Sequence, residues 1–150
     1  MRIRTPKSST VKTGACTATL TWAPDFSAKW EERYVRAQKF VDSEVIRLCA
    51  PYTPFDTGSL SRSANLGTAI GSGEVVWNAP YARYLYYGTL MVSPSTGSPW
   101  AKKGERKVQT GRELRYVGAP KRGKLWFERM KADHKQEILD GARRIIGGGR

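Results

Sequence analysis

The longest regular pattern in the chain is an apolar stripe that begins at residue 26 and ends at residue 48. Its members recur every three or four positions, the spacing of one face of an α-helix: Phe26, Trp30, Tyr34, Ala37, Val41, Val45 and Leu48. The opposite face carries charged side chains, namely Lys29, Glu32, Arg33, Arg36, Lys39, Asp42 and Arg47. Asp25 suits the start of this helix, and Pro51 ends it because proline has no backbone N–H to donate. At about 1.5 Å per residue, we expect a helix roughly 37 Å long.

The other expected elements are shorter and are separated by turns rich in glycine and proline. We expect strands at residues 14–22 and 113–117, a hairpin at 66–78, and helices at 59–65, 80–88 and 124–146. The hairpin turns at residues 71–73, and Gly88 ends the helix that Pro80 opens. These elements predict an α+β fold, in which a small, mostly antiparallel sheet packs with the long N-terminal helix and a basic C-terminal helix.

A chain of 150 residues fits a single domain over residues 1–150. We expect a flexible N-terminal arm at 1–13 and a flexible tail at 147–150, where three glycines precede Arg150. Residues 90–112 combine proline, serine and glycine without any periodicity, which predicts a long loop. Loops of that length in a compact domain are usually functional or disordered.

The formal net charge of +13 is concentrated in the last third of the chain. Such a basic segment favours an anionic partner, so a basic nucleic-acid-binding module is one functional hypothesis. Lys121, Arg122 and Lys124 precede the last helix and are candidate contacts for an anion, including non-specific contacts to DNA. Residues 118–124 also have the spacing of a phosphate-binding loop. An NTPase is nevertheless disfavoured because Leu125 replaces the hydroxyl residue that would bind Mg²⁺.

The triplet Asp56-Thr57-Gly58 is also found at the active site of aspartic proteases, where two such aspartates share one proton. This chain has one copy, so the protease hypothesis requires a homodimer. Because a proline-rich segment precedes the triplet instead of an apolar strand, we expect Asp56 to be a helix cap. His134 is the only histidine, which leaves a metal site short of ligands. We expect a protein that is not an enzyme and has no cofactor.

Tyrosines crowd the segment from residue 81 to residue 87. Aromatic side chains anchor protein interfaces, but they also fill cores and stack on the bases of single-stranded nucleic acids. We expect a subunit interface that uses Trp30, Tyr84, Tyr87 and Trp126.

Two motifs in this order resemble the minor capsid or tail-completion proteins at the head–tail neck of long-tailed bacteriophages. The first is Pro54-Phe55-Asp56-Thr57-Gly58-Ser59-Leu60, and the second is Pro80-Tyr81-Ala82-Arg83-Tyr84-Leu85-Tyr86-Tyr87-Gly88-Thr89. The matching positions are Asp56, Thr57, Gly58, Leu60, Tyr81, Ala82, Tyr84, Gly88 and Thr89. The similarity spans about residues 25–146, including the preceding long helix and a C-terminal helix near Trp126. The loop at 90–112 is longer than is usual in that family.

The resemblance implies a structural virion protein that completes the tail or connects it to the head. It implies a homo-oligomeric ring, six-fold or twelve-fold, that contacts head-completion proteins and tail-tube or tail-terminator proteins. The protein would assemble in the host cytoplasm and reside in the virion neck. We expect no membrane association, because no apolar run approaches the ~20 residues of a transmembrane helix.

Overall fold

The computed structural model describes residues 3–116, 118 and 120–147, so most of the expected tail at 147–150 lies outside the described residues. Its helices are α1 (Phe26–Cys49), α2 (Ser59–Gly67), α3 (Ala82–Tyr87) and α4 (Trp126–Ile146). Its strands are β1 (Ser9–Thr13), β2 (Cys16–Leu20), β3 (Thr89–Val92) and β4 (Val108–Glu113). The α+β class is confirmed, and so are the four predicted helices. None of the described helices combines the length and apolarity that crossing a bilayer requires.

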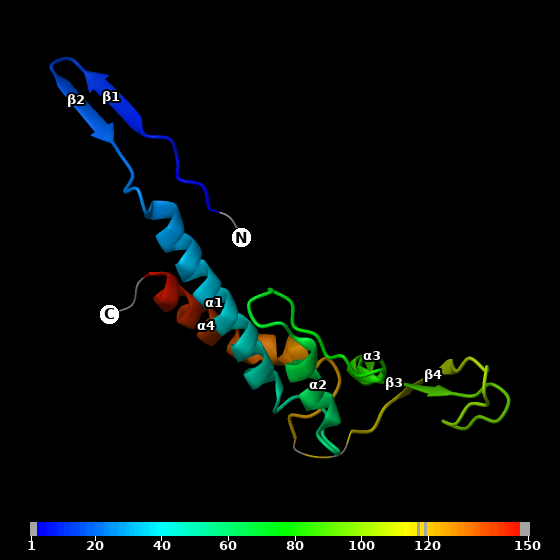
Figure 1. Cartoon of the computed structure of the whole chain (residues 1–150). Coiled ribbons are helices and arrows are strands. Elements are labelled where there is room, and N and C mark those ends of the chain that lie inside the picture. Colours follow the sequence, from blue (N-terminus) through cyan, green and yellow to red (C-terminus); the bar gives the residue numbers. More distant parts are fainter. Residues whose placement is uncertain (1–2, 117, 119, 148–150) are drawn as a thin grey trace.

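Helices α1 and α4 pack against each other in opposite directions and form the body of the molecule (Figure 1). Near one end, the Arg33 guanidinium donates a hydrogen bond to the carbonyl of Ile146 at 3.2 Å. Toward the other end, Arg47 lies 3.4 Å from the Glu137 carboxylate. The core is concentrated at that second end and includes Leu48, Cys49, Tyr52, Leu60, Trp126, Met130 and Ile138. The apolar stripe of α1 therefore contributes to the core through its second half.

The first half of the same stripe forms an aromatic ladder. Trp22, Phe26, Trp30 and Tyr34 follow one another with ring centroids 4.8, 6.0 and 6.2 Å apart. All four side chains are only half-buried. Figure 1 shows that the first turns of α1 extend beyond the end of α4.

Asp42 is buried, although the periodicity of α1 placed it on the charged face; that prediction is wrong. Only 2% of the residue is exposed. Its carboxylate accepts hydrogen bonds from the Gln38 side chain at 2.7 Å, and from the backbone N–H groups of Gly71 at 2.7 Å and Gly73 at 3.2 Å. The expected turn at 71–73 is present, but residues 66–78 form no strand. The turn is held by Asp42 instead of by strand pairing.

Strands β1 and β2 form an antiparallel hairpin that projects away from the body (Figure 1). Ser9 pairs with Leu20 and Thr13 pairs with Cys16 across a turn at Gly14, whose φ is +55°. Every residue of both strands is exposed. The strand expected at 14–22 is thus present over 16–20. Its partner strand, β1, lies within the arm at 1–13, where no sequence pattern indicated a strand.

Strands β3 and β4 form a second antiparallel hairpin, which projects from the opposite end of the body (Figure 1). Met91 pairs with Gln109 and Val92 pairs with Val108, with an irregularity between Thr89 and Met91. The prediction of a single long loop at 90–112 is therefore wrong at both of its ends. The strand expected at 113–117 is also wrong over the described residues, because β4 ends at Glu113. The antiparallel strands lie in two separate hairpins rather than in one sheet.

Candidate functional site

The first motif lies in the loop between α1 and α2, and buried residues at 52 and 53 fix the start of that loop. The Tyr52 hydroxyl donates a hydrogen bond to the Asp133 carboxylate of α4, and this bond raises the pKa of Tyr52 above its ordinary value. The Thr53 hydroxyl donates to the Cys49 carbonyl at 2.9 Å. Since both partners belong to the body of the molecule, the motif that follows is held on a rigid support.

Gly58 turns the chain into α2. It occupies the position before the helix with φ +78°, a conformation that favours glycine. A Cβ atom at this position would lie 3.0 Å from Cε2 of Phe55. The hydroxyls of Thr57 and Ser59 are 2.8 Å apart, and Leu60 is buried in the core. The local geometry of this turn therefore accounts for the residue types at three motif positions, Thr57, Gly58 and Leu60.

Asp56 does not cap α2, so that prediction is wrong. Gly58 occupies the cap position, and no side chain caps this helix. Asp56 is exposed in a bend between two helices, two residues before the glycine that redirects the chain. The support that an aspartic protease gives its aspartate, a loop on a rigid sheet, is not present around Asp56.

The second motif forms α3 and the turn that follows it. Ala82 is buried, Tyr81 precedes the helix, and Gly88 ends it with φ +70°. The Gly88 N–H donates to the Tyr84 carbonyl at 3.0 Å, which confirms the predicted stop. A Cβ atom on Gly88 would lie 2.7 Å from the Tyr116 hydroxyl oxygen. Thr89 then begins β3. Gly88 is thus required both by its backbone angle and by the close approach of Tyr116.

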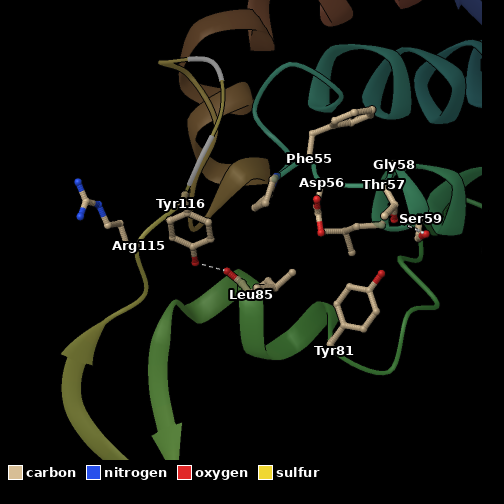
Figure 2. A pocket seen from close by; sticks show the side chains of 11 residues that line it. Phe55, Asp56, Thr57, Gly58, Ser59, Tyr81, Leu85, Arg115 and Tyr116 are labelled. Carbon is tan, nitrogen blue, oxygen red and sulfur yellow. Dashed lines mark hydrogen bonds between the residues drawn. The ribbon is translucent and has the colours of Figure 1, made fainter. Parts of the chain in front are cut away.

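The two motifs line one cavity of about 600 Å³ (Figure 2). Residues 54–60 form one wall, and Tyr81 and Leu85 of the second motif form another. Arg115 and Tyr116 complete the lining. The Tyr116 hydroxyl donates to the Leu85 carbonyl at 2.5 Å, and burial raises the pKa of Tyr116. Figure 2 shows Arg115 pointing away from the cavity, whereas Tyr81 faces the Asp56–Ser59 segment. Segments about 20 residues apart in the sequence therefore meet at one place.

The lining of this cavity carries little acid–base chemistry. Asp56 is its only carboxylate, and the lining contains no histidine, cysteine or lysine. Over the residues that the structure describes, no group of three His, Cys, Asp or Glu side chains is placed to hold a metal ion. The lining residues of the cavity combine apolar and aromatic side chains with hydroxyl-bearing ones, and only Asp56 and Arg115 among them are charged.

The residues expected at a subunit interface lie in different surroundings. Trp30 is half-buried in the aromatic ladder, with the Arg33 guanidinium 5.2 Å from its ring centroid. Tyr84 is half-buried, and Tyr87 is 60% exposed. Trp126 is only 2% exposed and meets the Tyr86 ring edge-on at 4.7 Å. The interface prediction is therefore wrong for Trp126, which is a core residue because the rings of Tyr86 on α3 and of Trp77 pack against it.

The residues expected to contact an anion are held by contacts within the chain. The Lys121 ammonium lies 5.3 Å from the centroid of the Tyr52 ring. The Arg122 guanidinium donates to the Thr53 carbonyl at 2.8 Å and lies 4.7 Å from the Phe55 ring centroid. Lys124 forms an ion pair with Glu113. In this structure the three cations fasten the segment before α4 to the first motif and to β4, and they do not form one open cluster.

Sequence reasoning missed Arg115 and Tyr116 as residues that line the cavity. Their only sequence signal was the alternation of residues 113–117, which we assigned to a strand.

Comparisons of the chain with family models, with curated proteins and with solved structures find no match.

Proposed function

We propose that this protein is a structural subunit of the head–tail neck of a long-tailed bacteriophage, where it completes the tail or connects it to the head. The observation that carries the proposal is the pair of hairpins that extend from opposite ends of a helical body (Figure 1). All ten residues of β1 and β2 are exposed. An isolated two-stranded hairpin is marginally stable in water, and its free edges pair readily with other chains. Neighbouring subunits would supply that pairing.

The aromatic ladder on α1 gives the same proposal a second support. Trp22, Phe26, Trp30 and Tyr34 are all half-buried, and Val35 beside them is 46% exposed. Aromatic side chains with an adjacent arginine are typical anchors of protein interfaces. A second copy of the chain, packed against this end of α1, would bury the ladder and extend the assembly toward a six-fold or twelve-fold ring.

The cavity between the two motifs fits a role in contacts with other neck proteins. Both motifs that resemble the neck family contribute to it, and its walls rest on buried residues of α2 and α3. In the proposed assembly, a head-completion protein or a tail-tube or tail-terminator protein would insert a side chain there. The protein would then act by holding adjoining rings in register, without a chemical step.

Self-association of the purified protein is the first test, by sedimentation velocity and negative-stain microscopy. Trp30→Ala should weaken association by about 2 kcal/mol or more, roughly thirty-fold in the association constant. Leu66→Ala is the matched control, because Leu66 is 87% exposed on α2 and lies outside the ladder. Circular dichroism should show both variants folded. An association that Trp30→Ala leaves unchanged would contradict the proposed interface.

The second test is assembly itself. Heads and tails prepared separately should fail to join when this protein is absent and should join when it is added back. If normal, infectious particles form without the protein, the neck assignment is wrong, and a nucleic-acid-binding module becomes the preferred function.

A further inference from the structure

The tip of the β3–β4 hairpin, residues 93–107, is held in shape by a hydrogen-bond network around the Glu105 carboxylate. The Glu105 carboxylate accepts hydrogen bonds from the hydroxyls of Ser93 and Ser95, each at 2.7 Å, and from the backbone N–H of Lys102 at 3.0 Å. Ser93 is completely buried, and its N–H donates to the Ser98 carbonyl at 2.8 Å. The tip is therefore a preorganised turn, although its composition suggested an unstructured loop.

The same tip carries positive charge that nothing else in the described structure neutralises. The tip holds four exposed cations, and none forms an ion pair with another described residue: Lys102, Lys103, Arg106 and Lys107. Glu105 is the only carboxylate in residues 93–112, and its oxygens are engaged inside the turn. Glu113, the next acid along the chain, pairs with Lys124. The hairpin thus presents a concentrated positive potential at the end of a projecting arm.

Exposed aromatic side chains accompany these cations. Trp100 is 85% exposed at the tip. A hollow of about 670 Å³ next to it is lined by Trp100, Tyr81 and Tyr84, together with Met91 and Lys107. Cations beside open aromatic faces are the pattern by which proteins hold phosphates and stack on bases.

We propose that the tip of the β3–β4 hairpin binds the backbone of a nucleic acid through its four cations, with Trp100 placed to stack on a base where the strand is unpaired. Lysine and arginine neutralise phosphates and release the counterions condensed on them, which favours binding at low salt. The site differs from the turn at Lys121 and Lys124, whose side chains already have partners within the chain. The proposal goes beyond the neck assignment and stands without it.

The test measures binding of the full chain to fluorescent oligonucleotides by anisotropy, with a duplex and a single strand as separate ligands. The hairpin variant changes four cations to glutamine: Lys102→Gln, Lys103→Gln, Arg106→Gln and Lys107→Gln. It should lose about tenfold or more in affinity near 50 mM salt. Its slope of log affinity against log salt should fall by about 3 to 4, because each of the four lost phosphate contacts removes roughly 0.7 unit on a single strand and 0.9 unit on a duplex.

A matched control removes the same charge from the exposed surface of α4 with Lys131→Gln, Lys135→Gln, Arg143→Gln and Arg144→Gln. It should retain most of the affinity and the salt slope of the wild type. If both variants lose affinity equally, binding reflects net charge alone and the proposal is overturned. If polyglutamate of matched charge competes as well as the oligonucleotides do, the tip recognises acidic chains in general, which also overturns it.

Trp100→Ala distinguishes the two forms of nucleic acid. It should weaken binding of the single strand about tenfold and leave the duplex within about twofold, because only unpaired bases offer a free face for stacking. Equal affinities of this variant and the wild type for the single strand would refute the stacking role of Trp100. Absence of hairpin-dependent binding to both ligands would refute the site.

Discussion

Replacing Gly141 by alanine tests the helix pair that forms the body of the molecule. Gly141 is buried in the C-terminal part of α4 and faces the ring of Phe40 on α1. In an exposed helix, alanine is favoured over glycine by about 0.8–1 kcal/mol. Here a Cβ atom would lie 2.5 Å from Cε1 of Phe40, whereas carbon atoms in contact prefer about 3.5–4.0 Å. Relieving an overlap of about 1 Å requires the helices to separate or the ring to leave its rotamer.

Such overpacking typically costs about 1–3 kcal/mol. With a central cost of about 2 kcal/mol and a helix-propensity gain of about 1 kcal/mol, Gly141→Ala should lower the free energy of unfolding by about 1 kcal/mol. Urea denaturation followed by circular dichroism measures this change directly. For a chain of this size the melting temperature should fall by about 2–4 °C.

A double-mutant cycle separates the steric term from helix propensity. Phe40→Leu removes the ring atoms that the new methyl group would meet. In that background Gly141→Ala should become stabilising by up to about 1 kcal/mol, which gives a coupling of about 2 kcal/mol. If Gly141→Ala stabilises the wild type as it would an exposed helix, α1 and α4 do not approach as closely as this structure has them. If it still destabilises the Phe40→Leu protein, the clash with the ring is not the cause.

Three further predictions concern buried and engaged polar groups. Asp42→Asn should lower the free energy of unfolding by about 1–3 kcal/mol because it weakens a buried charged acceptor. Asp56→Asn, at an exposed position, should change the free energy of unfolding by less than about 0.5 kcal/mol. Equal losses in the two variants would contradict a stabilising role for the buried hydrogen bonds to Asp42. Burial raises the pKa of the Cys49 thiol to about 12, so iodoacetamide at pH 8 should label only exposed Cys16 in the native protein, and Cys16→Ser should abolish that labelling. Hydrogen bonds from serine hydroxyls lower the pKa of Glu105 from 4.5 to about 2. The contribution of Glu105 to the stability of the hairpin tip should therefore be complete above pH 4.5 and should disappear as the pH falls toward 2. A Glu105 carboxyl chemical shift that titrates near pH 4.5 in NMR would refute this.

The helices could be predicted from the sequence because their determinants are local. The apolar stripe from Phe26 to Leu48 has a periodicity that only a helix satisfies, and proline then ends it within a few residues. Gly88 ends α3 because its positive φ suits glycine, which the sequence alone indicated. The α+β class followed from these elements.

The hairpins could be predicted only in part, since neither β1–β2 nor most of β4 buries a face. A strand is recognised in a sequence by alternation between a buried and an exposed side, and strands whose residues are all exposed carry no such alternation. The composition of the first 13 residues therefore gave no indication that Ser9–Thr13 would pair with Cys16–Leu20. The network around Glu105 was hidden for a similar reason, because it joins residues about 10 apart within a segment that has no period.

Local patterns in the sequence predict where the helices lie and where glycine ends a helix or turns the chain. They also predict that one motif leads into α2 and that the other contains α3. Which side chains those elements bury depends on the packing of distant segments. Asp42 belongs to the charged face of α1 by its spacing, yet backbone N–H groups from a turn 29 residues away make its burial favourable. Trp126 is buried because the rings of Tyr86 and Trp77, from earlier segments of the chain, pack against it, whereas Trp30 remains half-buried. Burial depends on which distant segment arrives at a surface, and that is fixed by the packing of the whole chain rather than by any local pattern.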